Sequence, residues 1–265
     1  MRLVGLTCLG CMISMSLSAQ APPPAGTLAP TGTLRAVFLA GNPVQGRMDP
    51  QTGTATGPVP DLVRELSRLL NVPYAILGAP DAAGVIAAVN GRTADIGFLA
   101  YDETRAREVD FGAPFLVMLN SYVVRTGSSI RRTEDVDRAG VTVAAVKGQT
   151  QELFVSSHMK QAKVRVFPSM PPQAELERLL TSGEVDAFAV NRQRALDAQA
   201  GSDTKLRALP DSFLEVLQSF VVARGDQAKL GVIDRFVSDA RKSGFIKASI
   251  EHANLSGVDV ATGAK

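Results

Sequence analysis

The sequence predicts an α/β protein that is built from two lobes. Short apolar runs that fit buried strands alternate with segments of helical periodicity, which is typical of an open α/β sheet. A helix, a glycine and an aspartate lead into an apolar strand twice, at 81–100 and at 174–190, which indicates two lobes of similar build. Two extended runs, 119–125 and 217–224, share a Ser-aromatic-Val-Val pattern followed by arginine. We expect these two runs to be the paired strands that connect the lobes.

The composition is that of a protein with a packed core and without a nucleic-acid partner. Of the 265 residues 45% are hydrophobic, and a chain of this length suffices for two lobes. The formal net charge is +2, tryptophan is absent and 5% of the residues are aromatic, so neither a basic surface nor a base-stacking platform is indicated. The short basic pairs, Arg131 with Arg132 and Arg192 with Arg194, are expected to be solvated surface.

The first 21 residues have the features of a signal peptide. Arg2 supplies a positive charge, residues 3–17 are apolar, and Ala19-Gln20-Ala21 fits a cleavage site between small residues. A membrane span needs about 20 apolar residues, more than this run or any later one provides. We therefore expect an exported protein of the periplasm, with a flexible leader rich in proline and alanine at 22–31.

Both cysteines, Cys8 and Cys11, lie inside this predicted signal peptide. Their CxxC spacing is compatible with a redox or metal motif, and lipidation at Cys11 is a second alternative. Because the pair falls in an apolar segment that export removes, we expect a mature chain without cysteine and without a disulfide bond.

The first lobe is expected to contain three strands and two helices before the first connecting strand. Asp61 is expected to cap the first helix, and Gly91 to end the second. In chain order the expected elements are strand 33–39, a loop rich in glycine and proline at 41–58, helix 61–70, strand 74–77, helix 81–90 and strand 95–100.

The second lobe is expected to repeat this plan. Its elements are strand 141–146, a helix that begins at Thr150, helix 174–180 and strand 187–190. After the second connecting strand, an amphipathic helix at 230–242 ends before Gly244.

Two turns carry groups that suit a small anion. At 95–115 an apolar strand leads to Asp102, in an N-cap position, and to Arg105 in the first helical turn. Free backbone N–H groups beside a guanidinium attract anions. At 147–150, Gly148 lets the backbone approach a ligand, and Thr150 offers a hydroxyl where a helix begins.

These two turns resemble the bacterial extracellular solute-binding proteins of family 3, which capture amino acids and related solutes for ABC importers. That family has an Asp-led strand, a Thr-x-x-Arg turn and an Asp-Phe-x-x-Pro-Tyr tail, and a Gly-Thr-Thr-Gln-Glu-x-Phe turn in its second lobe. The matching residues here are Asp95, Asp102-Glu103-Thr104-Arg105, Asp110-Phe111-Gly112-Ala113-Pro114-Phe115 and the segment from Lys147 to Phe154.

The resemblance, from about Leu34 to Gly244, implies a two-lobed periplasmic-binding-protein-like fold of type II with two crossover strands at the hinge. Helix 230–242 would return to the first lobe, so residues 32–120 with 222–265 form lobe 1 and residues 121–221 form lobe 2. The resemblance also implies a monomer that binds a small-molecule ligand and delivers it to a membrane permease. It implies no cofactor and no metal.

Arg105 and Thr150 are the residues that this resemblance implies to hold a ligand carboxylate from opposite lobes. Gly148 and Gln149 belong to the same turn as Thr150. For Thr150, a plain helix cap is the alternative. For Arg105 the alternative is a surface salt bridge, and Arg107 is a less favoured candidate for the same role.

The sequence departs from the family pattern at positions that bear on the ligand. Asn191 replaces the carboxylate that pairs with an α-ammonium, and an amide brings no charge. Asp102 replaces the usual Thr or Ser, either to meet a ligand cation or only to cap the helix. Tyr101 and Phe38 are candidates to line the cleft, with core packing as the alternative for Phe38. The identity of the ligand therefore stays open.

An enzyme on the same scaffold is the second hypothesis, because some relatives of this family are dehydratases acting on cyclic carboxylates. Such chemistry needs an acid or base in the cleft, and Asp102 and Glu152 are the nearby candidates. A sensor or accessory lobe is a third hypothesis. No nucleophile motif or phosphate-binding loop is found, and His158 and His252 lack metal-ligand spacing. We therefore expect a binding protein without catalytic residues.

Overall fold

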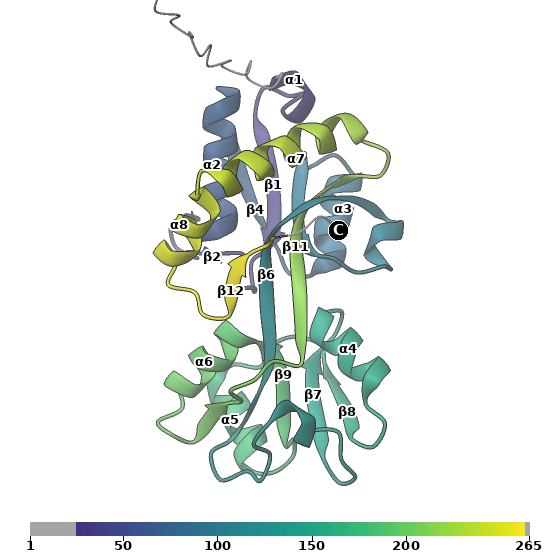
Figure 1. Cartoon of the computed structure of the whole chain (residues 1–265), viewed down its shortest axis with the longest axis vertical. Helices are drawn as coiled ribbons and strands as arrows, with labels where there is room; N and C mark the ends of the chain where they lie inside the picture. Colours follow the sequence, from purple (N-terminus) through teal and green to yellow (C-terminus); the bar gives the residue numbers. More distant parts are fainter. Residues whose placement is uncertain (1–24, 263–265) are drawn as a thin grey trace, which may run out of the picture.

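The computed structural model describes residues 25–262 and shows two α/β lobes joined by two long strands (Figure 1). A single sheet runs through both lobes in the order β4-β1-β5-β11-β6-β9-β7-β8. The predicted fold class, a two-lobed α/β protein with paired crossover strands, is confirmed. No helix within residues 25–262 is long and apolar enough to cross a membrane.

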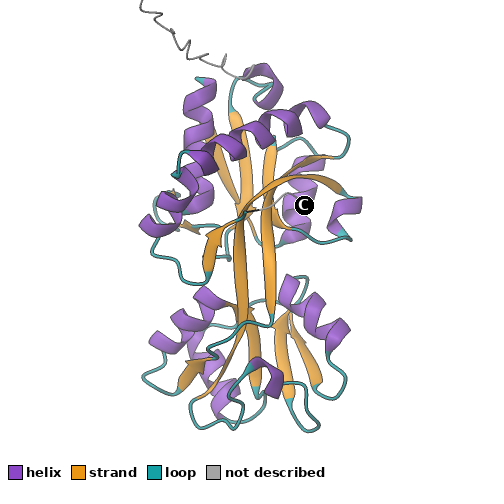
Figure 2. Cartoon of the chain, in the orientation of Figure 1, coloured by secondary structure: helices purple, strands orange, loops and turns teal. Residues whose placement is uncertain are grey.

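Lobe 1 is built on three parallel strands, with β1 between β4 and β5. Helices cover both faces of this sheet (Figure 2). The elements are α1 Ala25–Leu28, β1 Leu34–Leu39, β2 Arg47–Met48, β3 Ala55–Thr56, α2 Pro58–Leu70, β4 Tyr74–Ala79, α3 Ala82–Asn90, β5 Ile96–Ala100, the 3₁₀ helix η1 Arg105–Arg107, α7 Gln227–Lys242, α8 Phe245–His252 and β12 Val258–Val260.

The alternation of side chains along β1 explains why both faces need cover. Leu34, Ala36 and Phe38 enter the large core beneath α2, α7 and α8, whereas Val37 enters the smaller core beneath α3. Side chains that alternate between two apolar faces favour a strand buried between helix layers.

Lobe 2 repeats the arrangement with β7 between β8 and β9, again parallel. Its cores lie on the two sides of that sheet, one under α5 and α6 and the other beside α4. The elements are η2 Thr133–Asp135, β7 Thr142–Val146, α4 Thr150–His158, β8 Lys163–Phe167, α5 Gln173–Thr181, β9 Ala187–Asn191, α6 Arg192–Ala200 and β10 Leu206–Ala208.

The connecting strands are β6, Val109–Arg125, and β11, Leu214–Ala223, which pair antiparallel as expected. The strand β6 is longer than the predicted run and pairs with β9 through Asn120–Val123 in lobe 2. In β11, the residues Gln218–Val221 already pair with β5 of lobe 1. The chain therefore re-enters the lobe 1 sheet a few residues before the expected boundary at 221/222.

The predicted internal repeat has a physical counterpart at the start of one strand in each lobe. The N–H of Asp95 donates to the carbonyl of Arg35, and the Asp95 carboxylate accepts from the Arg35 N–H at 3.0 Å. Asp186 makes the same pair of bonds with Thr142, at 2.8 Å to the carboxylate. In each lobe one aspartate thus joins the beginning of a central strand to that of its neighbour.

The structure corrects the predicted start of one helix and the predicted character of the leader. Helix α2 begins at Pro58, not at Asp61, because Pro58 fits the first helical turn and Gly57, with φ 113°, ends the preceding loop. The predicted flexible leader contains helix α1, whose Leu28 is fully buried in the lobe 1 core. The predicted signal peptide, with Cys8 and Cys11, lies outside the described residues.

Candidate functional site

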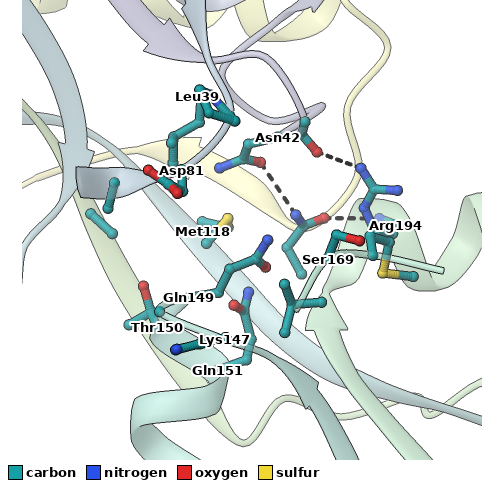
Figure 3. Close-up of a pocket in the computed structure, with 18 of the residues that line it drawn as sticks. Leu39, Asn42, Asp81, Met118, Lys147, Gln149, Thr150, Gln151, Ser169 and Arg194 are labelled. Carbon is teal, nitrogen blue, oxygen red and sulfur yellow. Dashed lines mark hydrogen bonds between the residues drawn. The ribbon is translucent and has the colours of Figure 1, made fainter. Parts of the chain in front are cut away.

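A cavity of about 320 Å³ lies between the lobes, where the parallel strands of both lobes end (Figure 3). The last residues of four strands line it, namely Leu39 of β1, Ala100 of β5, Val146 of β7 and Asn191 of β9. Ligands of open α/β sheets bind outside the carboxyl ends of the strands. The other lining residues are Gly41, Asn42, Pro80, Asp81, Ala82, Arg105, Met118, Lys147, Gly148, Gln149, Thr150, Gln151, Pro168, Ser169, Met170, Arg194 and Gln218.

Arg105 reaches across the cleft and is 6% exposed. Its Nη1 donates to the carbonyl of Ala100 at 3.1 Å, and its Nη2 donates to the carbonyl of Gly148, in lobe 2, at 2.7 Å. Burial lowers the pKa of Arg105, and the nearby Asp102 charge opposes this shift. An arginine stays charged despite such a shift. The predicted alternative, an ion pair with a neighbouring acid, does not form within residues 25–262.

Asp102 holds the main chain that positions Arg105. Its Oδ1 accepts from the N–H groups of Thr104 at 2.9 Å and of Arg105 at 3.1 Å. This is the capping role of a short acidic side chain at the start of a helical turn, here the 3₁₀ helix η1. Asp102 does not line the cavity.

The turn between β7 and α4 brings Gly148, Gln149 and Thr150 to the lobe 2 side of the cavity. Gly148 has φ 72°, a left-handed conformation that favours glycine. The N-cap of α4 is Gln149, and no side chain caps the helix, so the predicted alternative of a plain Thr150 cap is not realised. The first N–H groups of a helix have no partner within it, and the residues at this start of α4, Gln149, Thr150 and Gln151, all line the cavity.

Asn191 ends β9 and touches both lobes. Its Oδ1 accepts from the Arg194 N–H at 2.9 Å and so caps α6, while its Nδ2 donates to Oδ1 of Asn42, in lobe 1, at 3.3 Å (Figure 3). Both ends of the amide are therefore engaged.

Arg194 is a cavity residue that the sequence did not reveal. Its guanidinium donates to the carbonyl of Gly41 across the cleft, and burial lowers its pKa, against the opposing effect of Asp197. The expectation of solvated surface is wrong for Arg194, because the cap at Asn191 starts α6 with its first turn facing lobe 1. The position three residues after a strand-ending asparagine was the available clue.

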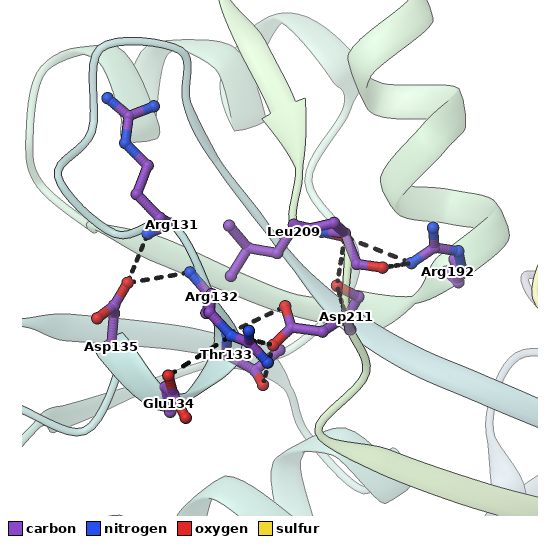
Figure 4. Close-up of polar contacts among 10 residues, drawn as sticks. Arg131, Arg132, Thr133, Glu134, Asp135, Arg192, Leu209 and Asp211 are labelled. Carbon is purple, nitrogen blue, oxygen red and sulfur yellow. Dashed lines mark hydrogen bonds and ion pairs between the residues drawn. The ribbon is translucent and has the colours of Figure 1, made fainter.

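The other three arginines of the two basic pairs lie outside the cavity, in a polar network of lobe 2 (Figure 4). Arg131 and Arg132 are exposed, and the Arg132 guanidinium is 3.6 Å from the Asp211 carboxylate. Arg192 donates to the carbonyl of Pro210 at 2.8 Å. These residues contribute to the surface of lobe 2.

Two aromatic candidates are placed away from the cavity. Phe38 is fully buried in the core beneath α2 and does not line the cavity, so core packing, the alternative given for it, is what the structure shows. Its position in β1 points it to the α2 face, since neighbouring strand residues alternate. Tyr101 is 43% exposed and packs edge-on against Phe111, with 5.3 Å between ring centres.

Residues 25–262 contain no cluster of three or more metal-ligating side chains. His158 stacks on Phe154 with 4.1 Å between ring centres, and His252 lies in α8 of the other lobe. The polar side chains that line the cavity include the donors Arg105, Lys147, Thr150 and Arg194.

Comparison with known proteins identifies the family of the chain. The model of "Bacterial extracellular solute-binding proteins, family 3" matches residues 35–253. No curated protein matches the sequence.

Three solved structures illustrate the similarity. A mutant of ArgBP from T. maritima is 24% identical, with a TM-score of 0.71 over 87% of this chain and 98% of that one. A putative binding component of an ABC transporter from Wolinella succinogenes, complexed with lysine, is 21% identical, with a TM-score of 0.73 over 83% and 95%. An ancestral amino acid-binding protein, a precursor of cyclohexadienyl dehydratase, is 23% identical, with a TM-score of 0.71 over 86% and 97%.

All three share the two-lobed fold over nearly their whole length, and the family model covers most of this chain. The chain therefore belongs to the bacterial extracellular solute-binding proteins of family 3.

Proposed function

We propose that this protein is an exported, periplasmic solute-binding protein that captures a small carboxylate-bearing solute, an amino acid or a related organic acid, between its lobes. It then delivers the solute to the membrane permease of an ABC importer and acts as a monomer. The observation that carries the proposal is the Arg105 guanidinium in the interlobe cavity, whose partners in the described part of the chain are carbonyl groups only.

The chemistry of capture follows from the groups on each side of the cavity. A solute carboxylate accepts two hydrogen bonds from the planar guanidinium of Arg105 and takes the place of the Gly148 carbonyl at Nη2. From lobe 2, the free N–H groups of α4 and the Thr150 hydroxyl donate to the same carboxylate. Gly148 and Gln149 shape this turn, and Asn191 contributes a neutral amide.

Closure is a population shift in this account. A solute that contacts both lobes only when they are closed stabilises that state by its differential affinity. Lobe 1 comprises about 32–120 with 222–265, and lobe 2 comprises about 121–221. The hinge is formed by β6 and β11, the only strands within residues 25–262 that cross between the lobes. The closed form is the one that the permease recognises.

A thermal-shift panel tests the proposal. The purified protein is heated with amino acids, dicarboxylates, cyclic carboxylates, and sugars as neutral controls. We expect at least one carboxylate class to raise the melting temperature in a saturable way, since a ligand that binds only the folded state stabilises it. The absence of any carboxylate effect, or a larger effect of the sugars, would overturn the proposal.

The same panel separates binding from catalysis. The carboxylates of Asp102 and Glu152, the candidate acids of the enzyme hypothesis, hold backbone N–H groups and do not line the cavity. We therefore expect every solute that binds to be recovered unchanged after prolonged incubation. Consumption of a bound solute, lost in Asp102→Asn or in Glu152→Gln, would favour a dehydratase-like lyase instead.

Delivery has its own test. An ABC permease complex is reconstituted in vesicles, and its ATP hydrolysis is measured with the protein and the best solute of the panel. We expect stimulation that needs both. Equal stimulation by the protein without solute would argue against solute-dependent delivery.

A further inference from the structure

The ionisable side chains of the interlobe cavity are unevenly divided between the two signs of charge. Arg105, Lys147 and Arg194 line it, against a single carboxylate, Asp81, so its formal net charge is +2. Figure 3 shows Asp81 on the opposite side of the cavity from Arg194. A cleft with such an excess of one sign attracts solutes of the other.

Neither guanidinium has a carboxylate within ion-pair distance in the described part of the chain. Arg105 donates to the carbonyls of Ala100 and Gly148, and Arg194 donates to the carbonyl of Gly41. A partly desolvated cation with only carbonyl partners gains most from an anionic ligand. Because Arg105 belongs to lobe 1 and Arg194 to lobe 2, two carboxylates of one solute can meet one guanidinium each.

The cavity is poorly suited to bind an ammonium group. Asn191 is neutral, and both ends of its amide are engaged, by the Arg194 N–H and by Asn42. Asp81 caps α3, with its Oδ1 accepting from the Gly84 N–H at 2.8 Å. A desolvated ammonium group needs a charged, hydrogen-bonded partner. Next to Asn191, the cavity instead presents the guanidinium of Arg194, which repels an ammonium group.

A buried amide donor indicates independently that the solute brings a hydrogen-bond acceptor. Gln45 accepts from the Leu39 N–H with Oε1 and donates with Nε2 to the Phe98 carbonyl, which fixes the orientation of its amide. Its Nε2 also donates to Oε1 of Gln218 at 2.9 Å. The Nε2 of Gln218 is therefore turned away from Gln45, and it has no partner in the described residues, although Gln218 is 1% exposed and lines the cavity. A buried donor without a partner calls for an acceptor from the ligand.

We infer that the solute is a small dicarboxylate without an amino group, with one carboxylate on Arg105 and the other on Arg194. The inference rests on the proposed function and narrows its solute class. The Thr150 hydroxyl and the Gln218 amide donate further hydrogen bonds to the solute. Arg194 determines the specificity for dicarboxylates, because its positive charge attracts the second carboxylate.

Calorimetric titration with two matched pairs of solutes tests the inference. Succinate is compared with aspartate and glutarate with glutamate, since the members of each pair differ only in the amino group. Arginine serves as the cationic control. We expect the better dicarboxylate to bind about tenfold or more tightly than its amino counterpart, and arginine to bind weakest. Tighter binding of the amino member in both pairs, or of arginine, would overturn the inference.

Three substitutions test the inference at single residues. Arg194→Gln is expected to weaken dicarboxylate binding about tenfold or more, whereas Arg192→Gln, on the same helix but outside the cavity, is expected to leave it unchanged. Asn191→Asp keeps a good cap for α6 and adds a partner for an ammonium, so it should shift the preference toward the amino member of each pair. An unchanged dissociation constant in Arg194→Gln contradicts the inference.

The proposed function and the dicarboxylate assignment are contradicted by different results. If no carboxylate of any class binds, the proposed function itself is wrong. If amino acids bind well and Arg194→Gln has no effect on them, the proposed function stands and only the dicarboxylate assignment falls.

Discussion

Single residues in the cavity gain their roles from the main chain that holds them. Arg105 is oriented by two carbonyls, one from each lobe, and its backbone is held by the Asp102 cap. The carbonyl on the lobe 2 side belongs to Gly148, whose left-handed backbone aims it at the guanidinium. A change at Gly148 therefore acts on the binding site through backbone geometry.

Comparing Gly148→Ala with Gly140→Ala tests this role. Both glycines lie in lobe 2 at positive φ, 72° and 85°, and an added Cβ would meet nothing within 4 Å at either one. Each substitution should cost about 1 kcal/mol of unfolding free energy from backbone strain alone. Only Gly148→Ala should also weaken solute binding, as measured by titration. Equal affinities of the two variants would show that the backbone geometry at Gly148 does not matter to the site.

At the scale of elements, each lobe starts a central strand with an aspartate that anchors its neighbour. The two anchors differ in strength. Asp95 is 1% exposed and also forms a two-point ion pair with the Arg35 guanidinium, at 2.7 and 3.0 Å. Within residues 25–262, Asp186 has only the main-chain bonds to Thr142.

Unfolding in urea is therefore expected to distinguish Asp95→Asn from Asp186→Asn. We expect Asp95→Asn to lower the unfolding free energy by about 2 kcal/mol, because hydrogen bonds to a charged partner are lost, and Asp186→Asn by about 1 kcal/mol. Solute affinity should be preserved in both, since neither residue lines the cavity. A reversed order of the two losses would contradict the assignment of the stronger anchor to lobe 1.

The sequence predicted most elements because their patterns are local. The helix predicted at 81–90, its end at Gly91 and the apolar run of β5 each depend on neighbours in the chain. The start of α2 was missed because Pro58 and Gly57 looked like part of a loop, although proline suits a first helical turn. The burial of α1 was missed because it depends on packing against α7, far along the chain.

The cavity was predictable only in part. Arg105 and the turn 147–150 were found through motifs, whereas Arg194 and Gln218 carry no motif and gain their place from the closure of the lobes and the pairing of β11 with β5. For Phe38 the cleft and the core both stayed open, because sequence alone does not say which face of β1 points to the cleft.

At the scale of the whole molecule, several polar contacts bridge the lobes around the cavity. Besides the bonds of Arg105, Asn191 and Arg194, the side chains of Arg47 and Asp197 form an ion pair of 3.0 Å. That pair is 63% and 42% exposed, so water screens it, unlike the buried contacts of Arg105. Closure should therefore depend on the cavity and little on this rim contact.

Asp197→Asn tests that division. We expect the dissociation constant of the best solute to change by less than about threefold, because exposed ion pairs contribute little. The titration is repeated at high salt, where the wild type should behave like the variant. A loss of more than about tenfold would assign closure to the rim rather than to the cavity.

The central claim is that one solute is held by both lobes at once. Calorimetric titration of the wild type, Arg105→Gln and Thr150→Val with the best carboxylate tests it most directly, because these positions line the cavity from lobe 1 and lobe 2. The account predicts that affinity falls in both variants, by about tenfold or more for Arg105→Gln and several-fold for Thr150→Val, since a bond from a charged donor is stronger. Full affinity in either variant would contradict a site shared between the lobes.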